Sequence, residues 1–182
     1  MMKLPIDGAR VQKVRETDIS AVARLEREGY PLDEAASEEK LLHRHSQAPE
    51  LFLGCYLRDT VIGYICSTRA NDDTLTEESM STHVPSGESV CIHSVCIDSS
   101  YRRQGMALAL LKAYVEHIGQ NCSGVKRLLL LTHTELLHLY TKAGFRLVGE
   151  SAVTHGARPW YECVLKLETT CEGDNMESMN AM

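Results

Sequence analysis

A strand-like segment that passes into a helix-like segment through a short basic turn constrains this chain more than any other feature. The run VCIHSVCI at residues 90–97 is rich in valine and isoleucine, and apolar residues recur at helical spacing from Ala107 to Ile118. The intervening turn, RRQGMA at residues 102–107, carries two arginines and a glycine. Main-chain N–H groups at such a helix start can approach an anion closely, so the turn predicts a diphosphate site.

Taken alone, the same turn also fits a basic surface turn before an ordinary helix. In a diphosphate site, Arg102 and Arg103 would add charge-assisted contacts to phosphate oxygens. The glycine spacing of a Rossmann fingerprint and the lysine of a Walker loop are absent here, which excludes those two nucleotide-binding classes.

The remaining hydrophobic pattern predicts alternating strands and helices. One helix is expected to begin behind an Asp18 cap, and a second is expected to begin at Ser37. In chain order we expect a strand at 9–14, helices at 17–30 and 37–48, strands at 51–57, 61–69 and 90–97, a helix from 107, a strand at 126–132, a helix at 134–144, and strands at 145–151 and 160–168. The apolar 126–132 strand is typical of one covered on both faces. This order predicts a mixed α/β sheet with a ligand at the carboxyl end of the 90–97 strand.

Length and composition favour one domain. The 182 residues are expected to form a single domain over 1–168, followed by a disordered acidic tail at 169–182. No apolar run approaches the ~20 residues that cross a bilayer, and the N-terminus lacks a secretory signal, so we expect a cytoplasmic protein with no membrane partner. Seven cysteines without a CxxC pair predict reduced thiols and no metal site.

Charge is distributed unevenly along the chain. The net charge of −6 arises from −6 over residues 1–90, +4 over 91–167 and −4 over 168–182. A basic middle segment suits a phosphate-bearing ligand, and an acidic first half suits a cationic one, although surface charge also varies freely without function. We expect no nucleic-acid partner and a monomer.

Two motifs carry a resemblance to a known family. CIHSVCIDSSYRRQGMALALL resembles the acetyl-CoA motif of the GNAT acyltransferase superfamily, (Q/R)xxGx(G/A), with Arg102, Gly105 and Ala107 in the defining places. ELLHLYTKAGF resembles the motif that follows it in that family. From Val11 to Leu167 the chain is most similar to arylalkylamine N-acetyltransferases, and GYPLDEAASEEK resembles their fungal and protist branch, in which polyamines also serve as acceptors.

The resemblance implies a fold, a cosubstrate and a set of positions. It implies the GNAT fold, a mixed and mostly antiparallel sheet flanked by helices, with acetyl-CoA as cosubstrate and a small-molecule amine as acceptor. The expected cofactor-binding residues are Val95, Cys96, Ile97, Arg102, Arg103, Gln104, Gly105, Met106, Ala107, Leu108 and Tyr140. The expected acceptor-site residues are Leu32, in a loop that covers the acceptor in relatives, and Leu131, Thr132 and His133.

The catalytic residues follow from the same resemblance and from the chemistry of amines. At pH 7 an alkylamine with a pKa of ~10.4 is only about 0.1% neutral, a deficit of roughly 4 to 5 kcal/mol that a base and desolvation can offset. His93 matches one of two family histidines that remove the proton, and Cys91 stands in the place of the other. Tyr140 matches the tyrosine beside the departing sulfur, and a Val95 main-chain N–H would meet the oxyanion.

Strand alternation adds a geometric expectation. Unless a bulge intervenes, Cys91, His93, Val95 and Ile97 point to one face of the sheet, so Cys91 and His93 would share one cavity. Cys91 is then a candidate for the proton relay or, less simply, for an acyl-enzyme.

Other interpretations of the sequence stay open. His93 also fits a core histidine, and Tyr140 fits a packing residue with a wet hydroxyl. The same machinery also serves acetylation of protein N-termini or lysines, and loss of one histidine fits a non-catalytic acyl-CoA sensor. Among amines, the sequence does not choose between serotonin-like, phenethylamine-like and polyamine acceptors.

Overall fold

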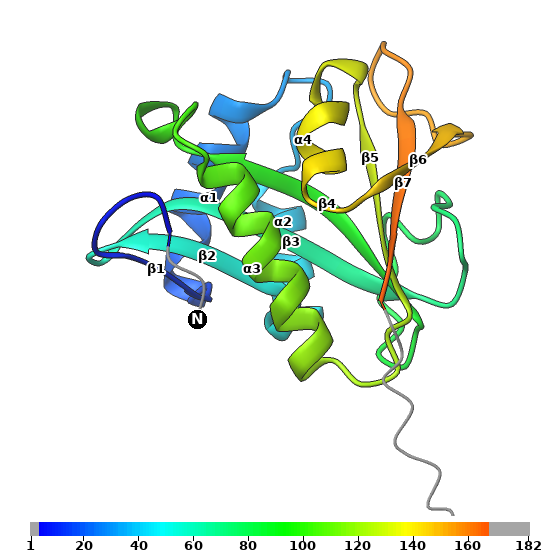
Figure 1. Cartoon of the computed structure of the whole chain (residues 1–182), viewed down its shortest axis with the longest axis horizontal. Coiled ribbons are helices and arrows are strands. Elements are labelled where there is room, and N and C mark those ends of the chain that lie inside the picture. The colour runs from blue at the N-terminus through cyan, green and yellow to red at the C-terminus, as the bar shows by residue number, and fades with distance from the viewer. Residues whose placement is uncertain (1–3, 168–182) are drawn as a thin grey trace, which may run out of the picture.

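The computed structural model describes residues 4–167, which fold around a seven-stranded sheet of order β1-β2-β3-β4-β5-β7-β6 (Figure 1). The strands are β1 (Ala9–Lys13), β2 (Phe52–Leu57), β3 (Thr60–Ala70), β4 (Ser89–Ile97), β5 (Arg127–Thr132), β6 (Arg146–Glu150) and β7 (Tyr161–Lys166). Only β4 and β5 pair in parallel, and the other neighbours are antiparallel. The predicted mixed, mostly antiparallel α/β sheet is confirmed, and so is the predicted order of elements.

Four helices cover the two faces of the sheet (Figure 1). They are α1 (Ile19–Gly29) and α2 (Glu38–Gln47) on one face, and α3 (Met106–Asn121) and α4 (Leu137–Lys142) on the other. Short 3-10 turns occur at Glu16–Asp18, Pro49–Leu51, Ser99–Tyr101 and Thr134–Leu136. The parallel β4–α3–β5 connection is the crossover that the sequence pattern requires, because parallel strands cannot be joined by a hairpin.

Each face of the sheet buries its own apolar cluster. On the α3 side, Leu110 and Leu111 pack with Leu128 and Leu130, while Leu129 lies in a separate cluster on the opposite side. The 126–132 strand is therefore covered on both faces, as its continuous apolar run predicts. Full burial of such side chains contributes about 1.5–3 kcal/mol each, which makes these two layers the main support of the site.

The two predicted helix starts differ in outcome. Ser37 caps α2, because its hydroxyl accepts a hydrogen bond from the Lys40 main-chain N–H at 3.2 Å, as expected. Asp18 occupies the N-cap position of α1, as predicted, but its side chain forms no capping hydrogen bond. Its carboxylate instead accepts from Arg15 Nε at 2.7 Å and from the Tyr56 hydroxyl at 2.7 Å. The predicted tail at 169–182 lies outside the described residues.

A β-bulge at His93 changes the faces of β4. Cys66 of β3 is opposite Ser94 and Ser67 is opposite Ile92, so His93 is the extra residue between two paired positions. As a result, Ile92 packs in the same core cluster as Val95 and Ile97. Cys91 packs in a different cluster, with Leu129 and Val164. The expectation that Cys91, His93, Val95 and Ile97 share one face is therefore wrong.

Candidate active site

The site begins where β4 and β5 separate. The two strands pair from Ser89–Arg127 to Ile92–Leu130, and beyond this point they diverge (Figure 1). On its other edge β4 stays paired with β3 as far as Ile97. The carboxyl end of β4 therefore has one edge without a strand partner, which leaves main-chain N–H and C=O groups available to a ligand.

Tyr30 meets that edge at Val95. The Tyr30 hydroxyl accepts from the Val95 N–H at 3.1 Å and donates to the Val95 C=O at 3.3 Å. Burial is the main cause that raises the pKa of Tyr30 well above its ordinary value, with smaller contributions from Cys96 and Tyr140. A ligand that pairs with the Val95 main chain must displace this hydroxyl. The sequence does not predict this contact, because it joins residues 65 positions apart.

The basic turn ends at the N-terminus of α3. Gly105 occupies the N-cap position with φ +79°, a left-handed conformation that favours glycine, and it supplies no side-chain cap. Arg103 is also left-handed, at φ +59°. Because the first N–H groups of a helix have no partner within it, those of Met106 to Leu108 are available at an exposed turn. This geometry fits the diphosphate of a CoA.

The two arginines of the turn have different surroundings. Arg102 Nε donates to the Ile97 C=O at 2.8 Å, and its guanidinium lies close to Gly29 of α1, so it braces the end of β4. Arg102, Arg103 and Gln104 are all exposed, and Arg103 differs in that its side chain makes no such contact within residues 4–167. Of the two predicted phosphate contacts, Arg103 is thus the one without a described hydrogen bond to the protein.

A cavity of about 500 Å³ lies beside this edge of the sheet. Its walls come from α1, α2, the loop between them, β4, β5, the 77–81 turn and the loop between β6 and β7. The lining residues are Glu26, Tyr30, Glu34, Ala35, Ala36, Ser37, Lys40, Arg44, Glu77, Met80, Ser81, Ile92, His93, Ser94, Leu131, Val153, Thr154, His155 and Trp160. A space of this size suits a small organic ligand.

His93 lines the cavity with one ring nitrogen committed and the other free. The Thr68 hydroxyl lies 2.7 Å from His93 Nε2 and 3.3 Å from the Ser79 C=O. We assign the single Thr68 proton to that carbonyl; in the tautomer that follows, Nε2–H donates to Thr68 and Nδ1 keeps a lone pair. Nδ1 is the one buried side-chain nitrogen or oxygen among residues 4–167 with no hydrogen-bond partner. Thr68 was not anticipated from the sequence, because it lies on β3, 25 residues from His93.

The electrostatic surroundings of His93 keep its ring neutral. Burial lowers the pKa of His93 well below its ordinary value of 6.5, and the nearby cations Arg44 and Lys40 lower that pKa further. At neutral pH the ring is therefore able to accept a proton.

Tyr140 lies on the α3 side of the sheet. It is buried, with its ring edge-on to Phe145 at 6.1 Å between centroids. Burial raises the pKa of Tyr140 above its ordinary value, and the neighbouring Cys96 and Cys163 add to the shift. No hydrogen bond from its hydroxyl to another residue is present within 4–167. Its phenol therefore stays protonated and can act as an acid.

Cys91 lies away from the cavity lining. It is fully buried, and burial raises the pKa of its thiol to about 12. Such a thiol is a poor nucleophile, because the thiolate is the reactive form. The six cysteines within 4–167 are all free and buried, as expected of reduced thiols, while Cys171 lies outside the described residues.

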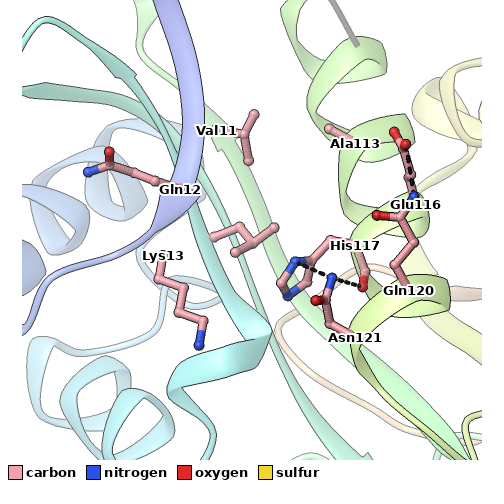
Figure 2. A pocket seen from close by; sticks show the side chains of 9 residues that line it. Val11, Gln12, Lys13, Ala113, Glu116, His117, Gln120 and Asn121 are labelled. Carbon is pink, nitrogen blue, oxygen red and sulfur yellow. Dashed lines mark hydrogen bonds between the residues drawn. The ribbon is translucent and has the colours of Figure 1, made fainter. Parts of the chain in front are cut away.

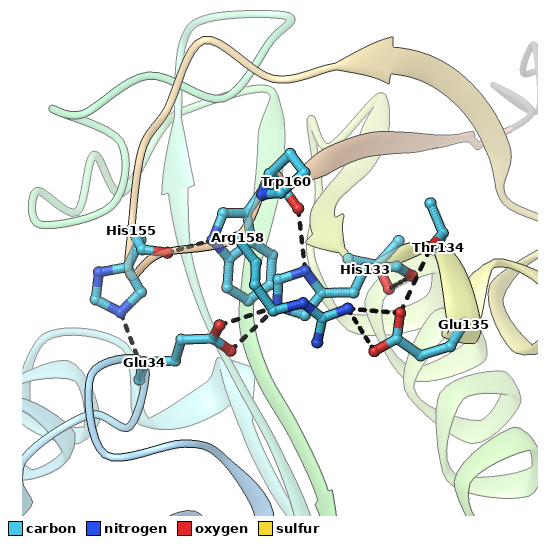
Figure 3. A network of polar contacts seen from close by, with 9 residues as sticks. Glu34, His133, Thr134, Glu135, His155, Arg158 and Trp160 are labelled. Carbon is cyan, nitrogen blue, oxygen red and sulfur yellow. Dashed lines mark hydrogen bonds and ion pairs between the residues drawn. The ribbon is translucent and has the colours of Figure 1, made fainter.

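The four predicted acceptor-site residues separate in the structure. Leu131 lines the cavity, whereas Leu32 is 90% exposed and does not line it. Thr132 is buried and donates to the His133 C=O at 3.1 Å. His133 lies beside the cavity wall in the polar network of Figure 3, bound to Glu34.

That network joins two loops that wall the cavity (Figure 3). His133 Nε2 lies 3.1 Å from both carboxylate oxygens of Glu34, and His133 Nδ1 lies 3.0 Å from the Pro159 C=O. His155 Nε2 donates to the Glu34 C=O at 2.9 Å, and the Trp160 ring stacks on His133 at 3.9 Å. We call Glu34, His133, His155 and Trp160 the clasp. It ties the α1–α2 loop to the β6–β7 loop at the end of β5.

A second cavity, of about 390 Å³, lies between β1 and the C-terminal half of α3 (Figure 2). Its polar side chains largely bind one another: Gln120 donates to Glu116 at 3.1 Å, and Asn121 donates to the His117 C=O at 2.9 Å. It contains none of the predicted site residues. Its chemistry gives no reason to place a reaction there.

Two further findings limit the chemistry. Within residues 4–167, no group of three or more His, Cys, Asp or Glu side chains is arranged to hold a metal ion. No helix in that range has the length and apolar character needed to cross a membrane.

Comparison with known proteins identifies the class that this fold and site define. Residues 19–145 match the acetyltransferase (GNAT) family. The chain therefore belongs to the GNAT family, whose members use acetyl-CoA. The match includes β4, the basic turn and α4, which are the elements that form the site.

Particular relatives refine this picture. Over 124 residues the chain is 31% identical to serotonin N-acetyltransferase from Mesocricetus auratus, a match that covers 68% of this chain and 59% of that protein. It is 28% identical over 130 residues to serotonin N-acetyltransferase from Macaca mulatta, covering 71% of this chain and 63% of that one. The matched region thus spans less than two thirds of these relatives.

A solved structure shows the same fold. The loading GNATL domain of CurA from Lyngbya majuscula superposes with a TM-score of 0.77 at 16% identity, covering 87% of this chain and 97% of that chain. At this identity the likeness concerns the fold alone. The predicted GNAT fold is confirmed.

Proposed function

We propose that the chain is an N-acetyltransferase that moves an acetyl group from acetyl-CoA to a small primary amine by direct attack in a ternary complex. The observation that carries this proposal is the ring of His93, which lines the cavity beside the β4–β5 opening and has an unpartnered Nδ1. A buried acceptor without a partner is costly unless a donor meets it during function. An amine N–H, or a water that the amine binds, is such a donor.

Acetyl-CoA supplies the acetyl thioester, and its binding is assigned to the basic turn and to β4. The N–H groups of Met106 to Leu108, with Arg103, hold the diphosphate at the start of α3. The Val95 to Ile97 edge receives the thioester. Once Tyr30 releases the Val95 N–H, that N–H stabilises the negative charge that develops on the carbonyl oxygen.

Two proton transfers complete the reaction. His93 takes the proton from the amine, because its lowered pKa keeps the ring neutral at pH 7. Tyr140 gives a proton to the departing sulfur, since its phenol is protonated at pH 7 and its hydroxyl binds no other residue within 4–167. The thiol of Cys91, buried and with a raised pKa, has no role in this scheme.

The acceptor is proposed to be small. The α1–α2 loop and the β6–β7 loop both wall the cavity, and the clasp ties these two loops together. This arrangement supports a compact amine over a protein chain as the acceptor. Similarity to serotonin N-acetyltransferases supports an arylalkylamine, and the GYPLDEAASEEK segment, which resembles fungal and protist relatives, supports a polyamine. We also propose that the chain acts as a monomer.

Thiol release from acetyl-CoA with purified protein tests the proposal. Tryptamine, phenethylamine, spermine and a lysine peptide are compared, and we expect acceleration by at least one small amine and little by the peptide. His93→Ala should lower kcat by about 100-fold or more, because general-base catalysis contributes about 10²–10⁴. His43→Ala, which alters an exposed histidine on α2, should leave kcat unchanged. CoA binding without acceleration by any amine would favour an acyl-CoA sensor instead.

A further inference from the structure

The carboxylates that line the cavity already have donors. Glu34 binds His133, and Glu77 accepts from the Thr154 main-chain N–H at 3.4 Å. Glu26 is 2% exposed and, besides the Cys96 thiol at 3.9 Å, it accepts from three donors. These are the Ala36 main-chain N–H at 2.9 Å, the Ser94 hydroxyl at 3.1 Å and the Tyr64 hydroxyl. Glu26 therefore has little acceptor capacity left for a cationic ligand, whereas the exposed Glu77 keeps most of its own.

The cations in the same cavity are in the opposite situation. Arg44 is only 7% exposed, yet its one hydrogen bond within residues 4–167 is from Nη2 to the Met80 C=O, at 3.3 Å. No carboxylate of the described chain lies within ion-pair distance of Arg44 or of Lys40, which precedes it by one turn of α2. A guanidinium has five N–H donors, and a buried charge without a counterion is unfavourable. The wall formed by α2 is thus a cationic surface without an anion.

This cationic surface lies next to the proposed base. Arg44 and Lys40 are both close enough to His93 to act on its charge state, and all three residues line one cavity. The residues that line the cavity thus include a buried nitrogen without a hydrogen-bond partner, His93 Nδ1, and two cations without a carboxylate partner within residues 4–167, Arg44 and Lys40. A ligand with an amine and an anion close together satisfies both kinds of group.

From this arrangement we propose that the acceptor is a carboxylate-bearing primary amine, with an α-amino acid as the simplest case. The inference rests on the proposed function and narrows its substrate class. Arg44 and Lys40 bind the carboxylate, which directs the amine toward His93. The amine nitrogen then forms a C–N bond with the acetyl carbon as the C–S bond breaks. The amine proton leaves through His93, and the sulfur takes a proton from Tyr140, so the products are an N-acetylamino acid and CoA.

Matched pairs of acceptors test this specificity. Each pair consists of an amino acid and the amine that remains when its carboxylate is removed: tryptophan with tryptamine, phenylalanine with phenethylamine, and lysine with cadaverine. Tryptophanamide is added because it keeps the size of tryptophan without its charge. We expect kcat/KM for at least one amino acid to exceed that of its paired amine by about 10-fold or more. We also expect tryptophanamide to behave like tryptamine.

Substitution at Arg44 tests whether the cationic surface causes the preference for amino acids over their paired amines. Arg44→Met keeps an unbranched side chain without charge, and it should lower kcat/KM for the amino acid about 10- to 100-fold relative to its paired amine. Such a loss equals about 1.4 to 2.8 kcal/mol, the range of a charge-assisted hydrogen bond. Arg44→Lys should restore part of the preference. Arg146→Met, which alters an exposed arginine on β6, should leave the ratio unchanged.

The possible outcomes separate this inference from the proposed function. If the plain amines are acetylated and the amino acids are not, or if Arg44→Met slows both members of a pair equally, the carboxylate inference is overturned while the acetyltransferase proposal stands. If no acceptor of either kind is acetylated, the acetyltransferase proposal fails as well. Should Arg44→Met not fold, Lys40→Met applies the same test at an exposed position.

Discussion

His93 owes its surroundings to a single extra residue in β4. Without the bulge, the side chains from Cys91 to Ile97 would alternate regularly between the faces. The sequence suggested the histidine through its resemblance to a family motif, but it did not reveal the bulge, because a bulge is visible only from the register of the paired strand. For the same reason the sequence does not predict the contacts of Thr68, Tyr30 and Arg44. Each of these residues contacts β4 or lines the cavity from an element that is distant in the sequence.

The charge around His93 predicts a specific pH dependence. Because burial, Arg44 and Lys40 lower the pKa of His93, the acid limb of kcat/KM should lie below pH 6.5, the ordinary value for histidine. Lys40→Met removes one cation and should move this limb to higher pH, since a neutral neighbour favours the protonated ring. The measurement is kcat/KM from about pH 4.5 to 8 for both proteins. A limb that is unmoved in Lys40→Met, or present unchanged in His93→Ala, would remove His93 as its source.

At the level of elements, the α1–α2 and β6–β7 loops are positioned by contacts that the sequence does not predict. The clasp connects Glu34, His133, His155 and Trp160 across as many as 121 positions, and none of its segments has a helical or strand periodicity that indicates a partner. By contrast, the helix start at Ser37 was predictable, because capping is a local interaction. Local contacts follow from sequence, whereas loop-to-loop contacts follow from the assembled sheet.

The clasp should govern binding of the acceptor more than binding of acetyl-CoA. Glu34→Gln keeps the shape of the side chain but removes the charge that binds His133, so the KM for the amine should rise about 10-fold. The KM for acetyl-CoA should change less than about 2-fold, because the α3 turn lies outside the clasp. Glu135→Gln is the matched control, since Glu135 forms an exposed ion pair with Arg158 at 2.7 Å. Equal changes in both KM values would contradict this division.

For the whole molecule, the order of strands and helices was predictable because each element carries its own periodicity. The apolar run at 126–132 predicted a strand covered on both faces, as β5 is, and the basic turn predicted a ligand at the end of β4. The cavity was not predictable, because its walls come from seven segments that meet only in the folded chain. The chemical class of the acceptor was likewise not predictable from the sequence, since it depends on which charged side chains of the cavity lack partners.

The central claim is that a CoA diphosphate binds the main-chain amides at the start of α3, and calorimetric titration of CoA into the full chain tests it most directly. We expect saturable one-to-one binding. In Ala107→Asp, binding should be at least about 10-fold weaker, because an acidic side chain suits a helix N-terminus but repels a diphosphate. No saturable heat with the unmodified chain, or equal affinity in Ala107→Asp, would contradict the account.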